Sequence, residues 1–304
     1  MKYFIITVDT EGDNLWSYKK GNDIETNNAL FIPRFQVLCE NYGFKPVWLT
    51  NYEMACDQRY VDYIKPRMEK GLCEVGIHVH AWNNPPLYEL DAKYTGNPYL
   101  IEYPDEIMLA KFETTYNLLK EKFGINVKSH RAGRWAMDGR YFSLLRHFGI
   151  EVDCSYTPGV SWRNTAGETM MGPDYSMVPL CRTFINGILE LPVTIRKTHI
   201  SRRGSIKHRL RVLLQGERQW LRPASSSINE MISLCKFIDK DPNIDYLEFM
   251  IHSSELMPKG SPYFKNKNEI EFLYNTIETV FKYVTNLGFE GITLEEYCNY
   301  IKRQ

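Results

Sequence analysis

Side chains that could carry out chemistry recur where the predicted strands of this chain end. The apolar run at residues 3–8 stops at three carboxylates on alternate positions, Asp9, Glu11 and Asp13. Further polar groups end later predicted strands: His78 and His80, His130 and Arg131, Asp153, and His252. In parallel α/β folds the carboxyl ends of the strands meet at one rim, so we expect these groups to converge there.

His78 and His80 are two residues apart on a predicted strand, so both side chains face the same side. Two imidazoles and a carboxylate form a catalytic type of metal site that keeps positions open. A bound divalent cation acidifies water and polarises a carbonyl group. Of Asp9 and Glu11, one could then hold the metal while the other handles protons. The alternative is a solvated acidic turn next to structural histidines.

Two further residues could complete such a site. His252, at the end of a distant predicted strand, could protonate a leaving group. Arg131 could keep the basic carboxylate ionised and oriented. The alternative for Arg131 is a buried ion pair that has no catalytic role.

The elements that must position these residues alternate along the chain. Strands are predicted at residues 3–8, 45–49, 73–80, 127–131, 150–153, 188–193 and 246–251. Helices are predicted at residues 30–43, 57–70, 106–123, 139–148, 228–238 and 269–287. This alternation predicts an α/β fold with a parallel sheet, and the strand count favours a distorted, seven-stranded (β/α) barrel.

Composition limits the possible partners and the number of domains. The 304 residues suffice for one large barrel or two modest domains, and we expect a single barrel domain over residues 1–304. The chain is 43% hydrophobic, enough to bury a sizeable core, and its formal net charge of zero predicts no nucleic-acid partner. We find no signal peptide and no apolar run long enough to span a membrane, so we expect a cytoplasmic protein. The seven cysteines include no Cys-x-x-Cys pair, and we expect them to be reduced.

The alternation is interrupted by an expected insertion at about residues 155–225. Within it, residues 196–222 contain nine Arg and Lys residues and a single acid, Glu217. If residues 205–221 are helical, they form a basic amphipathic helix. We expect this segment to meet the phosphates of a lipid- or nucleotide-linked sugar, or a membrane surface. The alternative is that its apolar residues pack on the barrel while its cations are solvated.

Five short segments resemble the motifs of the polysaccharide deacetylases, the NodB-homology carbohydrate esterases. These are residues 8–11, 74–80, 131–135, 152–155 and 250–253. The resemblance implies that Asp9 is the catalytic base and that Arg131 steadies it. It also implies that Glu11, His78 and His80 are the metal ligands.

The remaining motifs imply the other site residues. His252 would protonate the leaving amine, and Asp153 would support His252. Trp135 would line the substrate groove, where we also expect Arg134 and Trp82. One departure is plain: the family usually spaces its two histidine ligands four residues apart, whereas here the fourth residue after His78 is Trp82.

The resemblance is strongest to family members from bacterial surface-polysaccharide biosynthesis. It implies a NodB-like barrel that uses a divalent metal, with zinc the first expectation, to remove an N-acetyl or other N-acyl group from an amino sugar of a polysaccharide or its precursor. Two alternatives remain open. One is a deformylase-type amide hydrolase acting on a lipid-linked amino sugar. The other is a non-catalytic carbohydrate-binding protein on a degenerate barrel.

Overall fold

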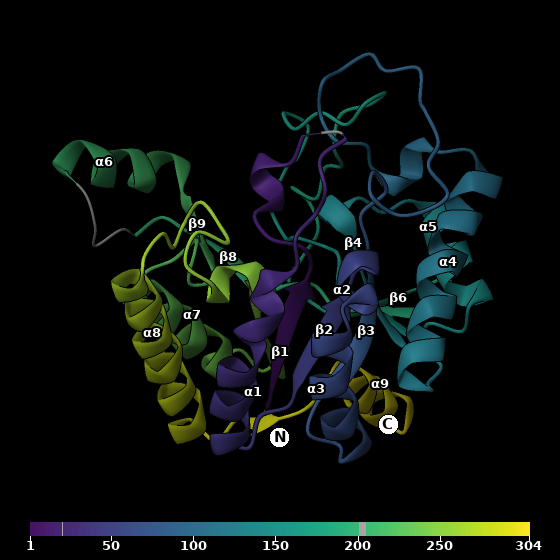
Figure 1. The fold of residues 1–304 in the computed structure, drawn as a ribbon. Coiled ribbons are helices and arrows are strands. Elements are labelled where there is room, and N and C mark those ends of the chain that lie inside the picture. The colour runs from purple at the N-terminus through teal and green to yellow at the C-terminus, as the bar shows by residue number, and fades with distance from the viewer. Residues whose placement is uncertain (20, 201–204) are drawn as a thin grey trace.

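The computed structural model describes residues 1–19, 21–200 and 205–304, which are built around a curled sheet (Figure 1). Its strands run in the order β10-β1-β2-β3-β4-β5-β7-β6, and every neighbouring pair from β10 to β7 is parallel. The parallel strands are β1 Tyr3–Thr10, β2 Pro46–Thr50, β3 Glu74–Val79, β4 Ser129–Ala132, β5 Val152–Asp153, β7 Ile188–Glu190 and β10 Tyr246–His252. The predicted distorted, seven-stranded (β/α) barrel is therefore confirmed. Two short strands extend the sheet: β6 Thr183–Ile185 pairs antiparallel with β7, and β11 Glu290–Gly291 pairs with β1.

Strand β1 is buried and has a paired strand on each side. All eight of its residues are buried, as expected for an apolar run without alternation, and it pairs with β10 on one side and β2 on the other. Its carboxyl end therefore lies between two other strand ends. That position explains why acids directly after it can reach residues from both neighbours.

Helices cover the outside of the sheet (Figure 1). They are α1 Ile32–Asn41, α2 Tyr52–Cys56, α3 Gln58–Glu69, α4 Asp105–Phe123, α5 Gly139–His147, α7 Ile228–Lys240, α8 Lys267–Asn286 and α9 Leu294–Lys302. Helix α8 illustrates how the local sequence determines where a helix begins and which face it buries. The Asn266 side chain caps its first turn by accepting from the Glu269 amide, and Ile270, Ile277 and Val284 recur on its buried face.

The sheet is not closed by strand pairing within the described residues, because β10 and β6 remain its two edges. A few residues fill the gap. The amide of Glu248 donates to Thr194 Oγ1 at 2.8 Å, and the amide of Met250 donates to the carbonyl of Leu221 at 3.1 Å. The hydroxyl of Tyr246 donates to the carbonyl of Pro192 at 2.9 Å. Segments around residues 192–194 and 221 thus complete the barrel wall.

The segment that interrupts the alternation contains a second, two-stranded sheet. Strand β8 Ile195–Thr198 pairs antiparallel with β9 Glu217–Trp220, and α6 Ile206–Gln215 lies between them in the chain. Of residues 205–221, whose helical character was stated as a condition, only Ile206–Gln215 are helical. Gly216 follows the helix with φ 77°, a left-handed conformation that ends it and turns the chain into β9.

Two further properties of the chain concern membrane-spanning helices and disulfide bonds. Among the described residues, no helix combines the length and the apolar character needed to cross a membrane. None of the seven cysteines forms a disulfide, and five of them are buried.

Candidate functional site

The carboxyl ends of β1, β3, β4 and β10 open into a pocket of about 380 Å³. Its lining comprises Asp9, Glu11, Leu15, Trp16, His78, His80, Trp82, Asn97, Tyr99, Ala132, Arg134, Trp135, Trp162, Thr165, Arg222, His252 and Tyr263. Most residues predicted for the site thus lie in one cavity. Arg131 lies directly beneath it, fully buried, and only Asp153 lies elsewhere.

Three predicted metal ligands come together at one side of the pocket. His80 Nε2 lies 2.6 Å from Glu11 Oε2, and His78 Nε2 lies 3.7 Å from the same oxygen. The two Nε2 atoms are 3.1 Å apart, and all three side chains are buried. Glu11, His78 and His80 each direct one potential ligand atom at a common point. Two imidazoles and one carboxylate are a donor set that suits zinc and other divalent transition metals.

The surroundings of the two histidines fit a metal. His78 Nδ1 lies 2.8 Å from the carbonyl of Arg131, and donating to it leaves the lone pair of His78 on Nε2, facing Glu11. Nδ1 of His80 is buried without a hydrogen-bond partner among the described residues. Gly133 makes room for this ring, because a Cβ there would meet the Val79 carbonyl at 2.3 Å and His80 Nδ1 at 2.9 Å.

The charges in this cluster act in opposite directions. Burial opposes ionisation of Glu11, but His252, His78 and His80 outweigh it and lower the Glu11 pKa. Burial likewise disfavours the cation of His78, yet the adjacent Asp9 and Glu11 raise its pKa. For His80, burial prevails and lowers the pKa. Metal binding requires an ionised carboxylate and neutral imidazoles; the shifts of Glu11 and His80 meet this requirement, and the raised pKa of His78 opposes it.

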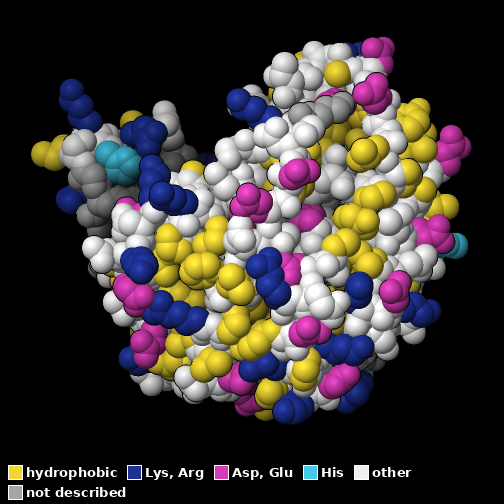
Figure 2. Space-filling view, viewed as in Figure 1, with side chains coloured by type: hydrophobic (Ala, Val, Ile, Leu, Met, Phe, Trp, Pro, Cys, Tyr) yellow, Lys and Arg dark blue, Asp and Glu magenta, His cyan; other side chains and the backbone are white. Residues whose placement is uncertain are grey.

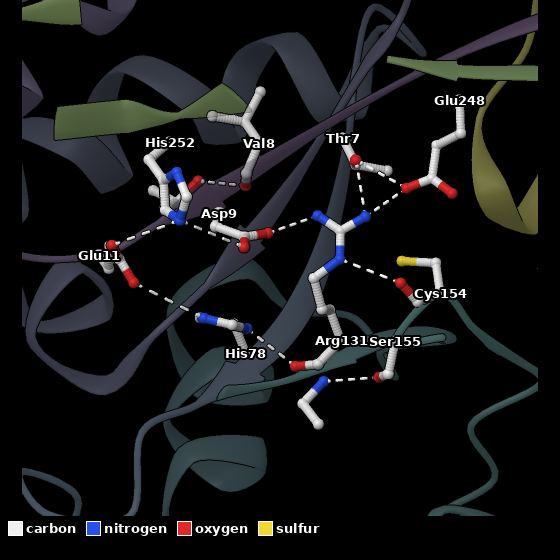
Figure 3. A network of polar contacts seen from close by, with 12 residues as sticks. Thr7, Val8, Asp9, Glu11, His78, Arg131, Cys154, Ser155, Glu248 and His252 are labelled. Carbon is white, nitrogen blue, oxygen red and sulfur yellow. Dashed lines mark hydrogen bonds and ion pairs between the residues drawn. The ribbon is translucent and has the colours of Figure 1, made fainter. Parts of the chain in front are cut away.

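Asp9 faces two partners with its two oxygens (Figure 3). Arg131 Nη1 donates to Asp9 Oδ1 at 2.5 Å, and His252 Nε2 lies 3.7 Å from Asp9 Oδ2. Burial raises the pKa of Asp9, but the Arg131 guanidinium and the nearby histidines more than offset this, so the net pKa is lowered. Asp9 is therefore a carboxylate at neutral pH, with Oδ2 directed away from the arginine.

Arg131 binds more than Asp9. Its Nη2 donates to Thr7 Oγ1 at 2.8 Å and to the carboxylate of Glu248, and its Nε donates to the Cys154 carbonyl at 3.1 Å (Figure 3). Burial disfavours the guanidinium cation, but its neighbours, Asp9 first and then Cys154 and Glu248, together outweigh this and raise the Arg131 pKa. The arginine thus crosses the barrel interior from β4 to β1 and β10, and each donor group it presents is used.

His252 projects into the pocket from the end of β10. Its Nε2 lies 3.8 Å from Glu11 Oε1, while its Nδ1 lies 3.1 Å from Glu255 Oε1 and 2.9 Å from Arg222 Nη2. Glu255 is fully buried in the 3₁₀ turn Ser253–Leu256 and also binds Arg222. Burial raises the Glu255 pKa, but Arg222 and His252 outweigh it and keep this group anionic. Arg222 can only donate, so a neutral His252 accepts from it at Nδ1 and carries its hydrogen on Nε2, facing the pocket. When the ring is protonated, Glu255 can accept from Nδ1–H instead.

The structure corrects the prediction that Asp153 supports His252. Asp153 Oδ1 lies 2.6 Å from Nδ1 of His130, whose Nε2 lies 2.8 Å from the Tyr141 hydroxyl. Residues 130, 153 and 190 are register partners across β4, β5 and β7, so their side chains share one face of the sheet. This is the outer, helix-covered face, because His130 alternates with the inward-facing Arg131. The pocket and Asp153 are thus on opposite sides of the sheet.

The predicted substrate-contacting residues all line the pocket. The Trp82 ring packs against His80 with centroids 4.2 Å apart, and Trp135 lies beside the Arg131 guanidinium. Arg134 donates to the carbonyls of Asn97 and Ala166, which ties two loops of the pocket wall together. Arg134 and Trp135 both have positive φ, 55° and 66°, a strained conformation that is commonest at functional sites.

Sequence reasoning missed three residues that the structure places in contact with the predicted ones. Glu255 follows His252 by three residues, and this short spacing was its available signal. Glu248 precedes His252 by four residues on the same strand face, so the alternation of β10 could have indicated it. Arg222 carried no such signal, because nothing in the sequence separates it from the other cations of the segment 196–222.

Comparison with known proteins shows which solved structures have a similar fold. No protein-family model matches this chain, and no curated protein sequence is significantly similar to it. A solved structure from Mycobacterium smegmatis, described as a polysaccharide deacetylase, matches with a TM-score of 0.55 at 11% identity, over 100% of this chain and 91% of that one. The chain therefore shares its fold with this protein.

Two glucan-processing enzymes also share the fold. The 4-alpha-glucanotransferase from Thermococcus litoralis matches with a TM-score of 0.53 at 14% identity over 98% of this chain, which spans 40% of the glucanotransferase. The GH57-type branching enzyme from Pyrococcus horikoshii matches with a TM-score of 0.54 at 11% identity, over 98% of this chain and 70% of that one. The fold alone is thus compatible with different carbohydrate chemistries, and the site must decide between them.

Proposed function

We propose that this protein is a metal-dependent hydrolase that removes an N-acyl group, in the first instance acetyl, from an amino sugar. The observation that carries the proposal is the arrangement of Asp9 between Arg131 and His252, with the Glu11, His78 and His80 cluster beside it. A divalent cation held by that cluster, with zinc the first candidate, would supply a Lewis acid for the amide carbonyl and for water.

The residues divide the proton transfers between them. Asp9 accepts the proton of the attacking water through Oδ2, since Arg131 occupies Oδ1 and keeps the group ionised. The new bond joins the water oxygen to the acyl carbon, and the carbon–nitrogen bond breaks. His252 delivers its Nε2 proton to the departing nitrogen, and Glu255 stabilises the cationic imidazole before that transfer. The products are a carboxylate and a free amino sugar.

The same geometry disfavours glycoside hydrolysis. A glycosidase needs one carboxylic acid that is protonated at neutral pH and a second carboxylate across the scissile bond. Among the described residues lining the pocket, the carboxylates are Asp9 and Glu11, which come from the same strand end. Both have lowered pKa values, so neither supplies the protonated acid.

A product assay tests the proposal. Purified protein supplied with zinc or cobalt is incubated with N-acetylglucosamine oligomers, with nucleotide-linked N-acetyl sugars and with lipid-linked N-formyl sugars. We expect release of a carboxylate matched by free amine from at least one class, and no release by Asp9→Asn. Release of formate from the lipid-linked donor alone identifies the deformylase alternative. New reducing ends without free amine would overturn the proposal in favour of glycoside chemistry.

A further inference from the structure

Helix α6 stands out from the barrel (Figure 1). Four of its apolar side chains are exposed and form a stripe. The exposed fractions are 77% for Ile206, 54% for Leu210, 59% for Leu213 and 80% for Leu214. These positions follow an i, i+4, i+7, i+8 pattern, which places them on one helical face. The alternative stated for the sequence, that these side chains pack on the barrel, is therefore wrong.

Contacts on the opposite side of the helix fix the stripe outward. Val212, on that side, is buried. His208 Nε2 lies 3.5 Å from Glu217 Oε2 on β9, and Nδ1 of His199, just after β8, lies 3.1 Å from the Leu213 carbonyl. The Ser205 hydroxyl caps the first turn by accepting from the His208 amide at 3.3 Å. The helix is thus held by one face, and the leucines remain on the other.

Cations border the apolar stripe. At 100° per residue, Lys207 and Arg211 flank it on one side and Arg209 on the other. The ten residues of α6 include no Asp or Glu, although the whole chain has no formal net charge. Figure 2 shows Lys and Arg side chains gathered on the protruding part of the molecule that carries α6. The positive charge is therefore concentrated where the apolar side chains are exposed.

We infer that α6 docks the protein onto an anionic membrane surface, with the stripe inserted among the lipids and the flanking cations at the headgroups. Interfacial helices bind by this combination of apolar burial and attraction to anionic lipid. A second copy of the chain fits less well, because pairing two α6 helices would bring their cations together. The inference rests on the exposed surface of α6 and is independent of the reaction proposed for the pocket.

Docking at α6 would also determine how the pocket faces the membrane. Strand β9 follows α6 directly, and its last residue, Trp220, packs against Trp135 and Trp162 of the pocket lining with ring centroids 6.2 and 6.5 Å apart. Arg218 Nε donates to the Gly159 carbonyl at 2.6 Å, which joins β9 to the loop that follows β5. Strand β9 therefore connects the docking helix directly to the wall of the pocket.

Vesicle co-sedimentation of the full chain tests the inference. We expect binding to phosphatidylcholine vesicles with about 30 mol% phosphatidylglycerol, little binding to pure phosphatidylcholine, and release between about 50 and 500 mM salt. Changing Leu210, Leu213 and Leu214 to Gln should weaken binding at least about tenfold. A Lys207→Gln and Arg211→Gln double variant should abolish the preference for anionic vesicles. Arg202 and Arg203, cations of the same segment, lie outside the described residues and are left unchanged.

Matched variants make the outcome decisive. Leu30, Met177 and Phe272 are exposed apolar residues on other elements, and changing all three to Gln should leave vesicle binding as in the wild type. Circular dichroism establishes that every variant is folded. Binding that the α6 variants retain, or equal binding to neutral vesicles, overturns the inference. The inference is also overturned if the wild type does not bind vesicles and light scattering shows that it is a dimer, whereas the leucine variant is a monomer.

Discussion

His252 Nε2 lies 3.7 Å from Asp9 Oδ2, and the two residues are register partners on the parallel strands β10 and β1. Parallel pairing makes adjacent strands present their side chains to the same face, so this proximity follows directly from the sheet. The other oxygen of Asp9 is bound by Arg131. The proposed proton acceptor and the proposed proton donor thus lie side by side, and their roles can be separated by substitution.

The first prediction concerns metal content. Untagged protein should carry about one divalent cation per chain, because three ligand atoms converge from Glu11, His78 and His80. Elemental analysis measures this directly. His80→Ala should lose the metal, whereas His147→Ala, at an exposed position on α5, should keep it. A low metal content that added zinc or cobalt cannot restore contradicts the prediction.

The two acids of the first strand end should behave differently. Asp9→Asn should lower turnover by about a thousandfold while the metal stays bound, because Asp9 acts on protons and not as a ligand. Glu11→Gln should lose both metal and turnover. Turnover and metal content are measured on the same preparations. If Asp9→Asn strips the metal and Glu11→Gln retains it, the two roles are reversed.

His252→Ala should lower kcat by about a hundredfold or more and change KM by less than about threefold, because protonation of the leaving nitrogen occurs only in the transition state. Steady-state kinetics over a full range of substrate concentrations separates the two constants. His147→Ala again serves as the control. A change confined to KM would make His252 a substrate-binding residue.

Glu255, and not Asp153, should support His252. Glu255→Gln should lower kcat by about tenfold with the metal retained, because it removes the anion next to His252 Nδ1. Asp153→Asn should leave kcat of the folded protein nearly unchanged and lower the melting temperature, because Asp153 bonds His130 behind the sheet. The opposite pattern, measured by kinetics and thermal unfolding, would restore the assignment made from the resemblance.

Stability should depend on pH through Glu74. Burial raises the pKa of this group to about 7 from its ordinary value of 4.5. The folded state therefore holds the proton more tightly, so its contribution is complete below pH 4.5 and is lost as pH rises through about 7. At most roughly 3 kcal/mol of unfolding free energy is involved.

Urea unfolding at about pH 5 and about pH 7.5 measures this effect. Glu74→Gln should make the decline smaller than in the wild type, because glutamine cannot ionise, while the buried Glu53 and Glu248, whose pKa values are also raised to about 7, keep part of it. Glu121→Gln, at an exposed position on α4, should decline as the wild type does. An unchanged slope in Glu74→Gln would show that Glu74 is ionised equally in both states.

The centre of the site was predictable because strand patterns determine it. A buried apolar run that ends at Asp9 and Glu11 indicates a strand paired on both sides, and the two-residue spacing of His78 and His80 directs both rings inward. The parallel order of the sheet then brings these ends together with His252. The functional roles of these residues remain predictions that the variants above test.

Other features depend on relations that one sequence does not display. The face of the sheet on which Asp153 lies depends on the register of β5 against β4, and the amino-acid sequence does not determine that register. The approach of Glu255 to His252 depends on a 3₁₀ turn directly after the strand. The early end of α6 depends on a single glycine conformation at Gly216, where the sequence pattern continued as a helix.

Arg131 also restricts how this sequence can change during evolution. One nitrogen binds Asp9, while another binds Thr7 and Glu248, so removing the arginine would leave two buried carboxylates without their cation. Replacing Asp9 alone leaves Glu248 paired. A descendant that had lost the reaction would therefore still be selected to keep Arg131. Among distant relatives, we expect retention of this arginine to indicate an intact barrel, and retention of both Asp9 and Glu11 to indicate the proposed chemistry.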